Sequence, residues 1–114
     1  MRFDHNESGN VITLTPGGPL DKDGAPELVP AVERAVQQAH RRFVLDLTRV
    51  PFADSVGLEV IITIARHITQ SGGRLGIFGA TDLMKQIFKA TRLDQRLEIL
   101  ESREQALAEL RAED

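Results

Sequence analysis

The alternation of hydrophobic and polar residues predicts a β-hairpin at the start of the chain. Residues 3–7 and 11–15 flank the turn-rich segment Ser8-Gly9-Asn10, and two short strands joined by such a segment form a hairpin. In the second strand, Thr13 and Thr15 alternate with Ile12 and Leu14. Because successive side chains of a strand point to opposite faces, we expect the threonines on a solvent-exposed face.

Hydrophobic residues with helical spacing predict two long helices. The first runs from about residue 25 to residue 40, and Pro30 lies within its first turns, where proline costs less than in the middle of a helix. Its apolar positions with helical spacing are Leu28, Val32, Ala35, Val36 and Ala39. The second helix spans about residues 55–70, because Asp54 and Ser55 are N-cap types and Ser71-Gly72-Gly73 provides a stop.

The remaining hydrophobic runs predict strands that alternate with two further helices. Residues 43–47 and 75–78 have the continuous apolar pattern of buried strands, and residues 97–100 are typical of an edge strand. Helices are expected from Thr81-Asp82 to Ala90 and over residues 102–111, where Ser102 and Gln105 have the capping-box spacing. This order indicates an α/β fold with a mixed central β-sheet, opened by the hairpin, and about four helices packed on it.

Composition narrows the classes of partner. With 114 residues, 41% of them hydrophobic, the chain suits a single folded domain over residues 1–114. A net charge of -3 and a pI near 5.6 argue against nucleic acid and membrane surfaces as partners. No run approaches the roughly 18 apolar residues of a membrane-spanning helix, and the first residues lack a signal peptide. We therefore expect no membrane insertion and a cytoplasmic protein that binds other proteins.

The most informative segment runs from a buried strand through a short loop to a helix start, residues 44–58, VLDLTRVPFADSVGL. It resembles the signature of STAS domains in anti-sigma factor antagonists, a hydrophobic strand ending in Asp, a short loop with an apolar residue, and Asp-Ser-x-Gly-Leu. The order of elements along nearly the whole chain is also similar. Asp54, Ser55, Gly57 and Leu58 align with the family's phosphorylation motif. Val56 stands where the family often has Ser or Thr, which leaves Ser55 the only hydroxyl of the motif.

The resemblance implies a STAS fold and a bacterial phosphoprotein that switches partners in signal transduction and transcription regulation. Unmodified, such a protein binds an anti-sigma factor that is also a serine kinase of the histidine-kinase-like ATPase type, and thereby frees a sigma factor. Phosphorylation of Ser55 would end this binding, and a serine phosphatase would restore it. Catalysis belongs to the partners, so the resemblance implies neither an enzyme nor a cofactor. STAS domains also occur in transport complexes, and a small soluble subunit of a lipid or other transport complex is the alternative.

The residues of the motif also have a purely structural interpretation. Asp54 or Ser55 would satisfy the free N–H groups at a helix start, and Gly57 would let the helix approach the sheet. Both interpretations hold together if capping leaves Ser55 open to modification. A phosphate at a helix N-terminus is partly compensated by free N–H groups and the macrodipole. We therefore expect phosphorylation to disturb a bound partner rather than the fold.

Helical periodicity assigns two faces to the second long helix. At about 100° per residue one broad face is expected to enter the core. That face carries Leu58, Ile61, Ile62, Ala65, Ile68 and Thr69. Val56 and Val60 fall nearly opposite, and Ile64 lies at the border. Exposed valines one turn apart beside the candidate phosphorylation site predict a docking face made by Val56, Val60 and Ile64 together with Asp54, Ser55 and Gly57.

Other candidate sites are weaker. Asp21 is expected either near the phosphorylation site, because the matching family loop lies there, or as a cap of the first helix. Its segment Asp21-Lys22-Asp23-Gly24 lacks the calcium-loop pattern, and His5, His40 and His67 lack metal-ligand spacing. No catalytic constellation or phosphate loop is found, which disfavours a nucleotide-hydrolysing domain. Most of the phenylalanines are candidates for the core: Phe3, Phe43, Phe52, Phe78 and Phe88.

Overall fold

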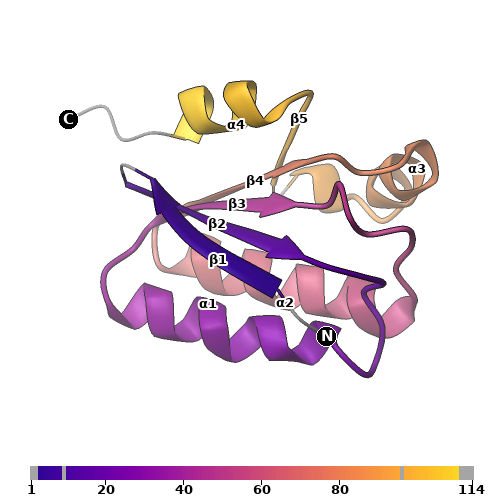
Figure 1. Cartoon of the computed structure of the whole chain (residues 1–114), viewed down its shortest axis with the longest axis horizontal. Coiled ribbons are helices and arrows are strands. Elements are labelled where there is room, and N and C mark those ends of the chain that lie inside the picture. Colours follow the sequence, from indigo (N-terminus) through magenta and orange to yellow (C-terminus); the bar gives the residue numbers. More distant parts are fainter. Residues whose placement is uncertain (1–2, 9, 96, 111–114) are drawn as a thin grey trace.

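The computed structural model describes residues 3–8, 10–95 and 97–110 and contains one five-stranded mixed sheet (Figure 1). The strands, in their spatial order, are β1 (Phe3–Ser8), β2 (Val11–Pro16), β3 (Arg42–Asp46), β4 (Arg74–Phe78) and β5 (Glu98–Leu100). β1 pairs antiparallel with β2, and β2 to β5 are mutually parallel. The predicted hairpin, mixed sheet and edge strand are confirmed, and the carboxyl ends of the four parallel strands lie at one edge.

The helices cover both faces of this sheet. They are η1 (Ala25–Glu27), α1 (Leu28–Gln37), α2 (Ser55–Gln70), α3 (Asp82–Ala90), η2 (Leu93–Gln95) and α4 (Arg103–Leu110). α1 and α2 pack side by side against one face, α4 lies on the opposite face, and α3 lies at one end of the molecule (Figure 1). The prediction of about four α-helices is confirmed, and Arg111, the expected end of the last helix, lies outside the described residues. None of the described helices is long and apolar enough to cross a membrane.

The first helix is shorter than its hydrophobic pattern predicts. A single 3-10 turn precedes α1, and α1 ends at Gln37. Ala39 has a φ of +73° and is exposed, so its predicted place within the helix is wrong. The N–H groups of Ala39 and His40 donate to the carbonyl oxygens of Val36 and Ala35, both at 3.0 Å. This left-handed turn satisfies the last carbonyls of the helix and directs the chain into β3.

The expected solvent-exposed face of β2 is also wrong. Thr13 is buried like its neighbours Ile12 and Leu14. Val11, on the same face of the strand as Thr13, packs in a small cluster with Ala106 and Leu110 of α4. The strand is interior to the sheet, and both of its faces are covered, so alternation of polarity does not correspond to exposure here.

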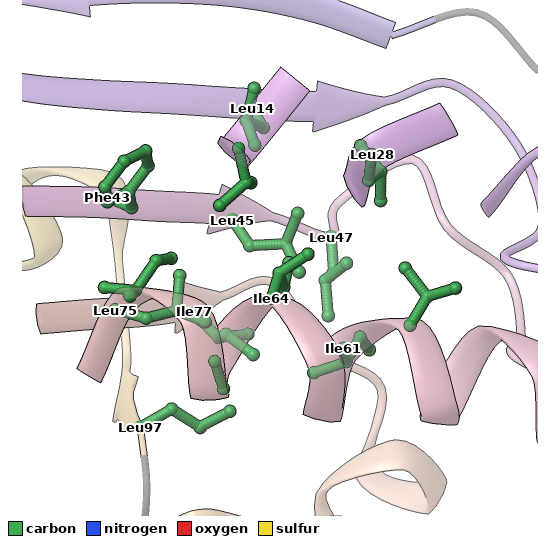
Figure 2. Close-up of a cluster of buried hydrophobic side chains, with 14 of the residues drawn as sticks. Leu14, Leu28, Phe43, Leu45, Leu47, Ile61, Ile64, Leu75, Ile77 and Leu97 are labelled. Carbon is green, nitrogen blue, oxygen red and sulfur yellow. The ribbon is translucent and has the colours of Figure 1, made fainter. Parts of the chain in front are cut away.

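The main hydrophobic core lies between the sheet and the α1 and α2 helices (Figure 2). The sheet contributes Phe43, Leu45, Leu75 and Ile77, which are almost completely shielded from solvent. Figure 2 shows Ile64 of α2 pointing toward the sheet side chains. This layer fixes α2 on the sheet and thereby sets the position of its first residue, Ser55.

Candidate functional site

The loop that follows β2 and the loop that follows β3 are joined at the carboxyl edge of the sheet. Leu20 and Ala53 form an isolated parallel bridge. The N–H of Leu20 donates to the carbonyl oxygen of Phe52, and the N–H of Asp54 donates to the carbonyl oxygen of Leu20, both at 3.0 Å. The segment that carries the candidate motif is therefore held on both sides of Ala53 by backbone hydrogen bonds.

Asp54 is the N-cap of α2. Its backbone is extended, with φ -91° and ψ -172°, and its carboxylate accepts a hydrogen bond of 2.9 Å from the N–H of Gly57. Ser55 is the first residue of the helix and is exposed. Its hydroxyl makes no hydrogen bond to another residue that the structure describes. Asp54 therefore caps the helix, and Ser55 is an exposed residue that takes no part in the cap.

Two substitutions of the N-cap residue separate the hydrogen bond of Asp54 from its negative charge. Asp54→Ala removes the acceptor for the Gly57 N–H and is expected to lower the free energy of unfolding by about 1 kcal/mol. Asp54→Asn keeps a good N-cap side chain without the charge, so its stability should stay close to that of the wild type. Urea unfolding of the three proteins measures this difference. Equal losses for both variants would contradict a hydrogen-bonding role of Asp54.

Gly57 allows an unusually close approach between α2 and the loop after β2. A Cβ atom at this position would lie 2.1 Å from the carbonyl oxygen of Leu20 and 2.7 Å from its carbonyl carbon. These are backbone atoms, which are themselves held by hydrogen bonds to Phe52 and Asp54. Gly57 therefore lets the first turn of α2 pack on the backbone of Leu20. The close contact is with the loop after β2 and not with the strands of the sheet.

Asp21 directly follows Leu20 and so lies beside the α2 start. Its carboxylate accepts hydrogen bonds from the N–H groups of Asp23 at 3.0 Å and Gly24 at 3.3 Å, which closes the turn before η1. The N-cap of α1 is Glu27, without a side-chain hydrogen bond. The expectation that Asp21 caps the first α-helix is wrong, and the alternative placement near the motif is the one observed.

The predicted docking face of α2 is wrong for two of its three hydrophobic residues. Val60 is 7% exposed and Ile64 is fully buried, and both belong to the main core. Leu58 and Ile62, expected in the core, are only partly buried, and Thr69 is exposed. The cause is that α2 packs on α1 as well as on the sheet, so its buried arc is wide and rotated from the predicted phase. Val56, which is partly exposed, remains available at the surface.

Two exposed hydrophobic side chains at this edge were missed by sequence reasoning. Phe52, expected in the core, is 51% exposed, and Leu83 in the first turn of α3 is 64% exposed. The sequence holds a partial signal for Leu83. α3 carries the adjacent apolar pairs Leu83-Met84 and Ile87-Phe88, and in each pair it is Met84 or Phe88 that is buried. Phe52 lies in a loop without periodicity, where the pattern gives no information.

The described residues contain no group of three or more His, Asp or Glu side chains that could hold a metal ion. His67 of α2 contacts Glu33 of α1 at 3.4 Å, and both side chains are partly exposed. That pair links the two helices and takes no part in the carboxyl edge of the sheet. The edge itself offers a solvent-facing hydroxyl beside carboxylates and hydrophobic side chains, an arrangement suited to contact with another protein.

Comparison with known proteins shows the family of the chain. The STAS domain model matches residues 2–106. The anti-sigma-B factor antagonist of Listeria monocytogenes is 33% identical over 90 residues, which cover 77% of each chain. An anti-sigma factor antagonist from Mycobacterium paratuberculosis has a TM-score of 0.83 at 22% identity and covers 97% of this chain and 94% of its own.

The phosphorylated form of SpoIIAA, a cell fate determinant of Bacillus, has a TM-score of 0.78 at 18% identity, over 96% of this chain and all of that one. At such identities the two structural likenesses show the fold alone. The family model, by contrast, extends over almost the whole sequence and includes the Asp54-Ser55 corner. The chain therefore belongs to the STAS domain family.

Proposed function

We propose that this protein is an anti-sigma factor antagonist controlled by phosphorylation of Ser55. The observation that carries the proposal is the exposed Ser55 at the first position of α2. Asp54 caps this helix, so the Ser55 hydroxyl is not needed for the cap. The proposed partner is an anti-sigma factor that is also a serine kinase of the histidine-kinase-like ATPase type. The relative from Listeria monocytogenes, described as an anti-sigma-B factor antagonist, supports this assignment.

The contact surface of this proposal is the corner formed by Asp21, Asp54, Ser55, Val56 and Gly57. Of these residues Ser55 is exposed, and Asp21, Asp54 and Val56 are partly exposed. Gly57 is buried and acts by seating the helix on Leu20. Val60 and Ile64 leave the proposed surface, because both lie in the core.

Phosphorylation would act on the contact and spare the fold. The γ-phosphoryl group of ATP would pass to the Ser55 oxygen, with ADP as the leaving product and the hydroxyl proton taken up by a base of the kinase. The phosphate adds about -1.5 to -2 charges. The N–H groups of Ser55 and Val56 have no acceptor within the helix and can bind it. The kinase must itself place nucleotide phosphates opposite Ser55, so a modified Ser55 would repel them. A serine phosphatase would reverse the switch.

The decisive experiment measures phosphoryl transfer. Each histidine-kinase-like ATPase encoded in the source genome is purified and incubated with the wild type, ATP and magnesium, and intact mass reports the gain of one phosphoryl group. Ser55→Ala is expected to abolish the gain, because no other hydroxyl of the motif exists. Thr81→Ala removes the hydroxyl that caps α3 at the same edge and serves as the matched control, with unchanged phosphorylation expected.

Ser55→Asp tests the consequence of the added charge. A carboxylate at the first position of α2 suits the helix N-terminus, so the melting temperature should stay close to that of the wild type. Binding to the kinase is expected to weaken at least tenfold, about 1.4 kcal/mol. Undiminished phosphoryl transfer to Ser55→Ala, or kinase binding unchanged by Ser55→Asp, would contradict the proposed function.

A further inference from the structure

We propose that Phe52, in the β3–α2 loop, and Leu83, in the first turn of α3, are the hydrophobic anchors by which this protein holds the anti-sigma factor kinase. The inference rests on the proposed function and adds to it a second part of the contact surface, contributed by α3. Phe52 and Leu83 are called the anchor pair below. Its occupant is a protein face with a hydrophobic centre and a basic margin.

The exposure of the anchor pair is unusual within this chain. Among the described residues, Phe52 and Leu83 are the large hydrophobic side chains that remain exposed, at 51% and 64%. Both belong to segments that follow the carboxyl ends of parallel strands, β3 for Phe52 and β4 for Leu83. α2 begins at this same edge with Ser55, three residues after Phe52. Hydrophobic residues that lie singly on a surface need no explanation, but their confinement to the edge that carries Ser55 indicates an interface.

The β3–α2 loop, which carries Phe52, and the β4–α3 loop, which leads to Leu83, pack directly on each other. Gly79 has a φ of +82°, and a Cβ atom there would lie 2.5 Å from the Thr48 methyl carbon and 2.7 Å from the Thr48 nitrogen. The N–H of Leu47 donates to the carbonyl oxygen of Phe78 at 2.9 Å. Only a residue without a side chain permits this approach, so the β4–α3 loop rests on the β3–α2 loop.

A buried carboxylate also holds the start of the β3–α2 loop. Asp46, at the end of β3, is 7% exposed, and its Oδ1 accepts hydrogen bonds from the N–H of Thr48 at 2.9 Å and from the Thr48 hydroxyl at 2.7 Å. On the other side, the carbonyl of Phe52 accepts the N–H of Leu20. The backbone of the loops beside the anchor pair is therefore already ordered before a partner binds, which lowers the entropy cost of binding.

The charged residues at the carboxyl edge of the sheet indicate which residues surround the hydrophobic centre of the partner's face. In the loops after β2, β3 and β4 and the first turns of the helices that follow them, the acidic residues are Asp21, Asp23, Glu27, Asp54 and Asp82, and the basic residues are Lys22, Arg49 and Lys85. Asp23 and Asp82 are exposed. Carboxylates at the margin of a hydrophobic contact favour Lys and Arg on the partner, since complementary charge guides encounter and register. A partner with an acidic face would be repelled here.

The test uses the purified kinase that phosphorylates Ser55 as its probe, with binding followed by calorimetry. Leu83→Ser and Phe52→Ser are each expected to weaken binding at least tenfold. Their melting temperatures should be nearly unchanged, because the side chains are largely exposed. Leu83→Met keeps the hydrophobic area and is expected to retain binding. Gln70→Ala, at the exposed end of α2 on the opposite edge, is the control without effect.

The possible results separate the anchor pair from the proposed function. If a kinase phosphorylates Ser55 but binds the double variant, which combines Phe52→Ser with Leu83→Ser, as tightly as the wild type, the anchor pair is wrong and the proposed function stands. If no kinase of the set binds the wild type, both are overturned. Self-association of the wild type that the double variant loses, without kinase binding, would assign the anchor pair to a second copy of this chain and overturn the inference. Increased binding at low salt, reduced by Asp82→Lys, would support the basic margin.

Discussion

Replacement of Ile64 by aspartate is expected to leave a chain that no longer folds at room temperature. Ile64 is fully buried in the main core and points from α2 toward the sheet (Figure 2). Loss of its packing costs about 2 to 5 kcal/mol. An unpaired carboxylate in the core adds several kcal/mol more. Because small domains are stable by only about 5 to 15 kcal/mol, the sum removes most or all of the stability. Circular dichroism and urea unfolding measure the effect.

Two variants complete this experiment. Ile64→Ala should remain folded with the free energy of unfolding lowered by about 2 to 5 kcal/mol. Arg66→Asp, at an exposed position of the same helix, should change stability by about 0.5 kcal/mol or less. A folded Ile64→Asp protein that has lost only its partner would restore the prediction from sequence that Ile64 lies on the docking face.

Gly57→Ala is expected to destabilise the protein and to reduce phosphorylation of Ser55. The new Cβ would overlap the carbonyl oxygen of Leu20, 2.1 Å away. To relieve the overlap the first turn of α2 must move away from the loop after β2. Overpacking of this kind costs about 1 to 3 kcal/mol. Alanine by itself favours a helix by about 1 kcal/mol over glycine, so a net loss would show that the contact dominates. Urea unfolding and the initial rate of phosphoryl transfer are the measurements.

Gly18→Ala is the matched control for this substitution. Gly18 lies in the loop after β2, and a Cβ at this position would meet no atom within 4 Å. Its stability and phosphorylation are expected to match those of the wild type or to improve slightly, because alanine restricts the unfolded chain. If Gly57→Ala were instead as stable as Gly18→Ala, the close approach of α2 to Leu20 would not exist in solution.

The local signals of the sequence determined where α2 and the strands begin and end, but not the bounds of α1. α2 spans Ser55–Gln70 as predicted, because an N-cap aspartate and a Ser-Gly-Gly stop act through atoms within a few residues of the helix ends. The strands were likewise predictable to within a residue, since short apolar runs between turns need no knowledge of their neighbours. The place of Ser55 at a helix start follows from the same local chemistry, whereas only the structure decided that Asp54 and not Ser55 caps the helix.

Only the tertiary structure decided which side chains of these elements meet solvent. Val60 and Ile64 are buried because α2 packs on both the sheet and α1, and periodicity in one helix does not reveal how many neighbours it has. Thr13 is buried because β2 lies inside the sheet and α4, formed by residues far along the chain, packs on that face. Phe52 and Leu83 lie in segments that follow β3 and β4, and only the structure showed that both remain exposed. Burial depends on contacts between distant segments, whereas caps and turns depend on adjacent residues.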